Sequence, residues 1–232
     1  MKVASQLRAN IAHRVVAGLG ATGLSCARYL YQRGLPFTVI DTRVQPPGLD
    51  ALRREMPGIE VFAGDYPKGL IENAAELIVS PGIALTAPIV DQALAVGVEV
   101  VGDIDLFMRE AAAPVVGITG SNAKSTVTEL VGQMARDAGL QVGVGGNLGT
   151  PALDLLDPLR ELYVLELSSF QLERAHRLGL AVATVLNLSA DHLDRHGSMS
   201  GYHLAKHRIF SGCRKAVVNP DDPHDATCWT GG

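Results

Sequence analysis

A lysine and two hydroxyl residues close a loop of small residues at positions 117–126, GITGSNAKST. The loop follows the apolar run 113–116 and leads into an amphipathic helical pattern. Phosphate binding requires converging backbone N–H groups, so bulky side chains must stay away from such a loop. Lys124 would reach the β- and γ-phosphates, and the hydroxyl of Ser125 or Thr126 would hold Mg²⁺. The predicted triphosphate-binding residues are Gly120, Ser121, Asn122, Ala123, Lys124, Ser125 and Thr126.

This loop departs twice from the strict G-x-x-x-x-G-K-[ST] pattern. Ile118 stands at the first glycine position and Ala123 at the second. The methyl group of Ala123 is tolerated if its φ is negative, and it is costly if the loop needs a positive φ. A glycine-rich helix start that binds nothing is the alternative interpretation.

A second glycine pattern, GLGATG at residues 18–23, directly follows the apolar run 14–17. Asp41 lies eighteen residues past Gly23, where the next strand ends. Such glycines let a pyrophosphate approach a helix N-terminus, and the carboxylate can bond a ribose hydroxyl. The pattern predicts a diphosphate-bearing nucleotide, without distinguishing NAD from a UDP-sugar. A tight turn without a ligand is the alternative. The Ser80-Pro81-Gly82 segment, which also follows a strand, could wrap a phosphate or sugar through its backbone, and a plain turn is the alternative there too.

Two polar residues interrupt apolar surroundings in the second half. Asn147 lies in the glycine-rich stretch 143–149, where it could contact a phosphate or a carbonyl; the alternative is a flexible loop. Glu166 interrupts an apolar strand, where an ionised carboxylate is costly unless it is paired or binds a metal. It is a candidate Mg²⁺ ligand, and the alternative is the exposed face of an edge strand.

Residues 187–196 concentrate polar groups after a further strand. His192 could complete a metal site with Asp191 or Asp194, and a histidine on a surface turn is the alternative. For His196 the surface interpretation is preferred. Lys206, on the helical pattern 202–210, reads as a solvated helix lysine.

Strands alternate with helices along the whole chain, which predicts parallel βαβ units with ligands at the carboxyl ends of the strands. The expected strands are 14–17, 37–40, 61–62, 77–79, 98–101, 115–118, 142–144, 163–167, 183–186 and 216–218. One helix should present an apolar face made of Val127, Leu130, Val131, Met134, Ala135 and Ala138. The predicted fold is α/β: a Rossmann-like parallel-sheet domain over residues 1–112, then an incomplete P-loop-type ATPase domain over residues 113–232.

Composition excludes several classes of protein. Hydrophobic residues make up 47% and charged residues 19%, which indicates a globular chain rather than a disordered one. The net charge is −4 without a basic tract, which argues against nucleic acid as the main partner. The sequence contains no run of eighteen apolar residues, so it predicts no membrane-spanning helix. Cys26, Cys213 and Cys228 lack metal-ligand spacing, and a reducing cytoplasm fits them best.

Taken in order, these blocks resemble the Mur ligases, the ATP-dependent amino-acid ligases of peptidoglycan synthesis. They are most similar to the branch that adds D-glutamate to UDP-N-acetylmuramoyl-L-alanine. The resemblance rests on residues 18–25, 41–43, 80–83, 102–105, 120–126, 145–147, 165–173 and 191–195.

The resemblance implies that ATP phosphorylates the substrate carboxylate and that the amine of D-glutamate attacks the acyl phosphate. Lys124 and Mg²⁺ would stabilise charge on the phosphoryl oxygens. By resemblance, Ser125 and Glu166 hold one Mg²⁺, while His192 and a carbamylated Lys206 serve a second. Lys124, His192 and Lys206 are thus the implied catalytic residues.

The substrate residues also come from the resemblance: Asn147, Ser168 and Gln171 near the substrate, and Thr22, Asp41, Thr42 and Ser80 around the UDP moiety. The family carries a C-terminal domain that has no counterpart among these blocks. We therefore expect this chain to be the front part of a longer one, monomeric, and unable to complete ligation alone. The alternatives are another Mur ligase or a folylpolyglutamate synthetase-like ligase, a nicotinamide-dependent oxidoreductase, and a noncatalytic nucleotide-binding fragment.

Overall fold

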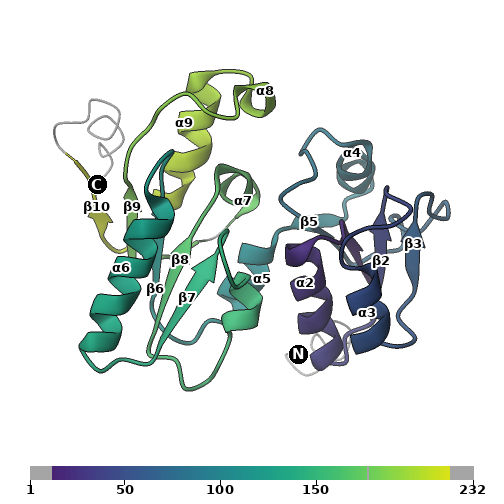
Figure 1. Ribbon diagram of the computed structural model, residues 1–232. Helices are drawn as coiled ribbons and strands as arrows, with labels where there is room; N and C mark the ends of the chain where they lie inside the picture. The colour runs from purple at the N-terminus through teal and green to yellow at the C-terminus, as the bar shows by residue number, and fades with distance from the viewer. Residues whose placement is uncertain (1–11, 177, 220–232) are drawn as a thin grey trace, which may run out of the picture. The chain divides into compact units, whose positions relative to one another are not determined.

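The computed structural model describes residues 12–176 and 178–219, and the chain divides into two compact units, Met1–Asp103 and Ile104–Gly232 (Figure 1). Each unit is built on one five-stranded parallel sheet with helical connections. The predicted α/β fold with two parallel-sheet domains is confirmed. In the described residues, no helix is both long and apolar enough to cross a membrane.

The first unit has the strand order β3-β2-β1-β4-β5. Its strands are β1 (Arg14–Ala17), β2 (Phe37–Asp41), β3 (Val61–Ala63), β4 (Glu76–Val79) and β5 (Glu99–Val101), and its helices are α2 (Ala21–Gln32), α3 (Leu49–Glu55) and α4 (Pro88–Ala95). Val15 and Val16 of the central strand are fully buried, because the sheet is covered on both faces. Chain order reverses on either side of β1, and α/β sheets bind ligands at such a switch point.

The second unit has the order β10-β9-β6-β8-β7. Its strands are β6 (Val115–Thr119), β7 (Val142–Gly146), β8 (Leu162–Glu166), β9 (Val182–Val185) and β10 (Ala216–Val217). Its helices are α5 (Asp103–Glu110), α6 (Lys124–Asp137), α7 (Ser169–Arg174), α8 (Leu193–His196) and α9 (Met199–His207), with short 3₁₀ turns η1 (Ala152–Leu155) and η2 (Arg208–Phe210). Strand β6 is central in this sheet, between β9 and β8, and the switch point lies beside it.

The division between the units differs from the boundary expected at residues 112–113. Helix α5 begins at the division, and it packs with the second unit rather than the first. The rings of Phe107 and Tyr163 meet edge to face at 5.1 Å, and the amide of His176 donates to Asp105.

The expected apolar face of α6 is partly wrong. Val127, Val131 and Ala135 do pack against the sheet, but Leu130 and Met134 are exposed. The fully buried positions are Thr128 and Gly132, which the apolar pattern leaves out. Close approach at Gly132 explains the difference, because a Cβ there would lie 2.5 Å from Val144 Cγ2.

We therefore predict that Gly132→Ala destabilises the chain, although alanine favours helices by about 1 kcal/mol over glycine. Overpacking against Val144 should cost about 1–3 kcal/mol. Urea unfolding of Gly132→Ala, Val144→Ala and the double variant measures the coupling. The substitution at residue 132 should cost less in the Val144→Ala background; an equal cost in both would contradict the steric explanation.

Candidate active site

The glycine turn after β1 is a close backbone approach. Gly18 has φ +90°, and a Cβ there would lie 3.0 Å from both Cβ and Oγ of Ser80. A Cβ on Gly23 would lie 1.8 Å from the carbonyl oxygen of Gly18. The Ser80 hydroxyl donates to that same carbonyl at 2.9 Å. Glycine is therefore required at both positions by packing, before any ligand is considered.

A cavity of about 670 Å³ opens at this turn. It is lined by all four residues predicted to surround the UDP moiety: Thr22, Asp41, Thr42 and Ser80. Strand register brings them together, since Ala17 pairs with Ile40 on one side and with Val79 on the other. Gly20 and Ala21, at the N-terminus of α2, also line the cavity, which suits the diphosphate of a nucleotide.

Asp41 is buried at the end of β2 and is satisfied within the protein. Its carboxylate accepts from the Leu19 amide at 2.7 Å and from the Arg43 guanidinium at 2.6 and 2.8 Å. The hydrogen bonds from Arg43 lower the pKa of Asp41 to about 2, against the opposing effect of burial. The carboxylate therefore stays ionised and fixes the direction of the Arg43 side chain.

Arg43 lines the same cavity and keeps half of its side chain exposed. Sequence analysis assigned it no role, although it stands two residues after the acid at a strand end. A guanidinium in the wall of a nucleotide-sized cavity can meet a phosphate with paired hydrogen bonds. The signal that was available is the spacing Asp-x-Arg directly after a strand.

The phosphate loop of the second unit connects β6 to α6 and contains a strained residue. Ala123 has φ +62°, which lies in the left-handed region. Sequence analysis expected the Ala123 methyl group to be costly if φ is positive, and φ is positive. The methyl group therefore stands at a position where glycine is favoured. Lys124 folds back over the loop and donates to the Ser121 carbonyl at 3.0 Å.

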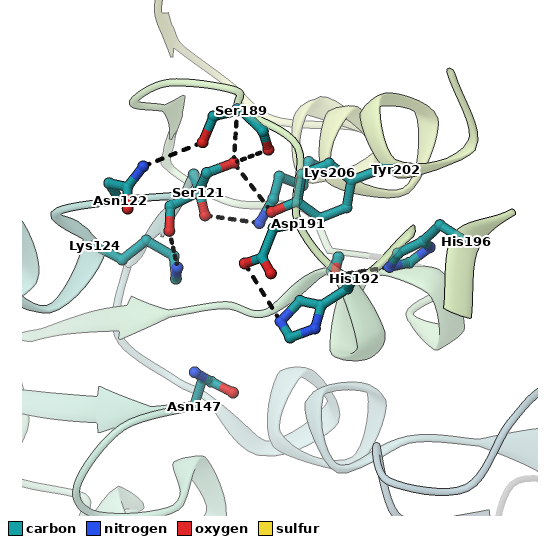
Figure 2. Close-up of polar contacts among 12 residues, drawn as sticks. Ser121, Asn122, Lys124, Asn147, Ser189, Asp191, His192, His196, Tyr202 and Lys206 are labelled. Carbon is teal, nitrogen blue, oxygen red and sulfur yellow. Dashed lines mark hydrogen bonds and ion pairs between the residues drawn. The ribbon is translucent and has the colours of Figure 1, made fainter. Parts of the chain in front are cut away.

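The loop is braced by the segment after β9 (Figure 2). Asn187 accepts from the Asn122 amide through Oδ1 at 2.8 Å and donates to the Asn122 carbonyl through Nδ2 at 3.1 Å. Ser189 donates its amide to Ser121 Oγ at 2.9 Å, and Ser121 Oγ lies 3.0 Å from the Ser189 carbonyl. Sequence analysis included both residues in the polar stretch 187–196 but assigned neither Asn187 nor Ser189 a role.

Glu166 is 3% exposed at the end of β8. The edge-strand alternative is wrong, because β8 lies between β6 and β7. Ser125 Oγ donates to one carboxylate oxygen at 2.7 Å, and Asn147 Nδ2 donates to the other at 2.8 Å. The structure thus brings together three residues that the sequence singled out separately. Thr126, the other candidate hydroxyl, is exposed.

The stretch before Asn147 is strand rather than loop, since β7 continues to Gly146. A Cβ on Gly145 would lie 2.2 Å from the Thr150 carbonyl, and one on Gly146 would lie 2.3 Å from the Glu166 carbonyl. These glycines permit close packing. They place the Asn147 side chain next to Glu166, and they do not make the segment a flexible loop.

Ser125 and Glu166 offer a hydroxyl and a carboxylate oxygen, which are ligands that Mg²⁺ takes alongside phosphate oxygens and water. In the described part of the chain, no three His, Cys, Asp or Glu side chains gather as a metal site. A cation here would therefore depend on oxygens of a bound nucleotide. The donor set fits Mg²⁺ in that shared manner.

Lys206 is 2% exposed, so the expectation of a solvated helix lysine is wrong. Its amine donates to the Gly120 carbonyl at 2.8 Å and lies 3.3 Å from Thr119 Oγ1. Burial, together with the nearby charge of Lys124, lowers the pKa of Lys206 to about 8, while Asp191 and Glu166 oppose the shift. Three charged groups from separate segments therefore act on the Lys206 amine.

His192 stands beside this cluster with φ +51°, again left-handed. Its Nε2 lies 3.5 Å from Asp191 Oδ2, and both side chains are about half exposed (Figure 2). Of the two carboxylates that the sequence offered as partners in a metal site, Asp191 lies within ion-pair distance of His192; metal binding by His192 stays a prediction. The imidazole is available to a ligand, and its ring contacts Phe170 at 5.0 Å.

Ser168 and Gln171 form a capping box at the start of α7. Ser168 Oγ accepts from the Gln171 amide at 3.2 Å, and the Gln171 side chain accepts from the Ser168 amide at 3.1 Å. Their polar groups stabilise the helix end. Their predicted contact with substrate stays a prediction.

Family models match both units. The model for the N-terminal domain of MurD-like Mur ligases matches residues 12–102, and the model for the Mur ligase middle domain matches residues 118–230. The chain belongs to the Mur ligase family. The two matched regions contain the cavity residues and the phosphate loop, respectively.

Curated relatives agree with this assignment. A UDP-N-acetylmuramoylalanine--D-glutamate ligase of Pseudomonas aeruginosa is 61% identical over 209 residues, covering 90% of this chain and 47% of the relative. A protein of the same name from Marinobacter nauticus is 54% identical over 208 residues, with the same two coverages. The chain spans about half the length of the curated relatives it matches.

A solved structure shares the fold of this Mur ligase chain. It is the UDP-N-acetylmuramate:L-alanyl-gamma-D-glutamyl-meso-diaminopimelate ligase from Neisseria meningitides, with a TM-score of 0.63 at 18% identity. The match covers 94% of this chain and 74% of that one. At this identity the likeness supports the arrangement of strands and helices alone.

The left-handed Ala123 yields a stability prediction. Ala123→Gly should stabilise the chain by about 1 kcal/mol, because glycine adopts this φ without steric cost. Ala138→Gly, at the other end of α6 with φ −78°, is the matched control and should be neutral or destabilising. Chemical denaturation decides, and equal effects of the two substitutions would contradict the strain at residue 123.

The low pKa of Asp41 yields a pH prediction. Its carboxyl is a stronger acid in the folded state, so its contribution is present above the ordinary value of 3.8 and is lost as pH falls toward 2. Asp41→Asn should remove about 2 kcal/mol at pH 7, discounted because Arg43 is half exposed. The stability difference from the parent should shrink between pH 5 and pH 2.

Unfolding curves across this pH range make the comparison. Asp50→Asn removes an exposed carboxylate from the first turn of α3, serves as the control, and should change the stability much less than Asp41→Asn does. A stability difference for Asp41→Asn that does not change with pH would contradict the role of the Asp41 charge.

Proposed function

We propose that this chain belongs to an ATP-dependent ligase that joins D-glutamate to UDP-N-acetylmuramoyl-L-alanine in bacterial peptidoglycan synthesis. The first unit holds the UDP moiety in the cavity at the end of β1. The second unit holds ATP at the loop before α6. The nucleotide substrates place the reaction in the bacterial cytoplasm.

The observation that carries this proposal is the contact between Ser125 and the buried Glu166, beside Lys124. An oxidoreductase that binds NAD at the first turn has no use for a second phosphate loop with this oxygen pair. A ligase that activates a carboxylate with ATP needs both nucleotide sites. The names of the relatives support the same choice of substrates.

The chemistry requires two transfers. A substrate carboxylate oxygen attacks the γ-phosphorus of ATP, and ADP leaves. The amine of D-glutamate then attacks the acyl carbon; phosphate leaves with the bonding electrons, and the amine loses a proton. Bound at Ser125 and Glu166, Mg²⁺ would neutralise charge on the phosphate oxygens.

Lys124 supplies a second positive charge to the transferring phosphoryl group. To do so, its amine exchanges the Ser121 carbonyl, 3.0 Å away, for phosphate oxygens. Backbone N–H groups at the start of α6 face the same phosphates. Asn147 keeps the Glu166 carboxylate oriented through its side-chain amide.

Lys206 is proposed to carry a carbamate. Its lowered pKa, about 8, leaves part of the amine neutral near pH 7–8, and carbamylation needs the neutral form. The amine adds to the carbon of CO₂ and releases one proton. The resulting anion, with His192, would form the second metal site; as an ammonium, Lys206 has no lone pair for a metal.

Ligand titration tests the proposed function. UDP-N-acetylmuramoyl-L-alanine should bind the 232-residue chain, and NADH should not. Asp41→Asn should weaken binding about tenfold, because Arg43 loses the partner that orients it. Asp50→Asn is the control. Calorimetry showing NADH bound more tightly than the UDP compound would favour an oxidoreductase and refute the ligase.

A further inference from the structure

His196 is buried, although sequence analysis preferred a surface turn for it. Its side chain is 1% exposed and lies where α7, α8 and α9 meet. Its ring lies 5.3 Å from that of Tyr202, measured between ring centres (Figure 2). A buried imidazole loses its hydration and needs polar partners.

Two polar partners fix the plane of the ring. Nε2 lies 3.0 Å from Ser169 Oγ, and Nδ1 lies 3.4 Å from Glu173 Oε1. An ionised carboxylate only accepts, so the proton belongs on Nδ1, and Nε2 then accepts from the Ser169 hydroxyl. Burial lowers the pKa of His196, which favours this neutral form.

Serine, histidine and glutamate in this order resemble a nucleophile with its base. Hydrolytic chemistry is excluded by access, because Ser169 is 2% exposed and has no room for a substrate. The same contacts do hold the imidazole in one orientation. Ser169 and Glu173 therefore serve to position the His196 ring. The contacts of that ring then indicate its role.

The faces of the ring contact two aromatic side chains. His196 stacks on Phe170, with ring centres 5.4 Å apart at 13°, and meets Tyr202 at 5.3 Å and 53°. Phe170 in turn contacts His192 at 5.0 Å. The Tyr202 hydroxyl lies 3.1 Å from Ser121 Oγ in the phosphate loop.

We propose that His196 is a positioning residue that aligns the phosphate loop and His192 through Tyr202 and Phe170. It touches neither nucleotide nor substrate. The inference deepens the proposed function, on which it rests for the identity of the ligand. His196 does more than pack in the core, because its two aromatic neighbours each contact a candidate site residue: Tyr202 contacts Ser121, and Phe170 contacts His192.

The test compares His196→Phe with a matched control in the same unit. Phenylalanine keeps a ring for stacking and removes both polar partners. His176→Phe makes the same change at a histidine whose side chain is 62% exposed and lies 3.5 Å from Asp105. Ser169→Ala is a second variant that removes one hydroxyl, should His196→Phe fail to fold.

Two measurements are made on the 232-residue chain: the Kd for Mg·ATP and amide hydrogen exchange without nucleotide. For His196→Phe we expect about tenfold weaker Mg·ATP binding and at least fivefold faster exchange of the Ser189 amide. The Val164 and Leu165 amides of β8 should keep their rates. Ser169→Ala should shift both measurements in the same direction by a smaller factor, and His176→Phe should change neither.

Unchanged binding and exchange in a folded His196→Phe or Ser169→Ala would overturn the inference. So would exchange that accelerates equally at Ser189 and in β8, which indicates loss of core stability alone. A parent chain that fails to bind Mg·ATP would contradict the proposed function. The exchange measurement would still decide whether His196 positions the loop.

Discussion

Both candidate sites depend on the parallel pairing of a central strand with a neighbour on each side. In the first unit, β1 aligns Ala17 with Ile40 and Val79, so the next residues meet at one edge. In the second, Ile118 of β6 pairs with Glu166, which also pairs with Gly146 of β7. Residues far apart in sequence become neighbours because parallel strands end at the same edge. A shift in register would separate the polar pairs that join different strands, such as Asn147 with Glu166.

The second site adds backbone strain to this register. Among the described non-glycine residues, positive φ occurs at Ala123 and His192, both next to the candidate phosphate site. Strained backbone persists where surrounding contacts determine it. At Ala123 those contacts are available: Asn187 and Ser189 bond the two residues before it. Buried polar groups need the same support, and Glu166 receives it from Ser125 and Asn147.

Local sequence signals were enough for the strands and the glycine turns, because periodicity and turn chemistry act within a few residues. Burial of single polar side chains was not predictable in this way. The sequence contains no strand order, so Glu166 could equally belong to an edge. Lys206 and His196 looked like surface residues because the elements that cover them come from other parts of the chain. The prediction of the apolar face of α6 was partly wrong for a related reason. An apolar pattern does not count glycine, and Gly132 is where the helix packs closely against Val144.

The charges of the second site suit a bound anion. Burial and the charge of Lys124 lower the pKa of Lys206, while Glu166 and Asp191 only partly compensate. The Lys124 amine donates its hydrogen bond to a carbonyl of its own loop, that of Ser121. A polyphosphate would give Lys124 a stronger acceptor than a carbonyl, and the proposed carbamate would remove the positive charge of Lys206. That electrostatic imbalance, more than the loop pattern itself, favours the proposed phosphate site over a glycine-rich helix start that binds nothing.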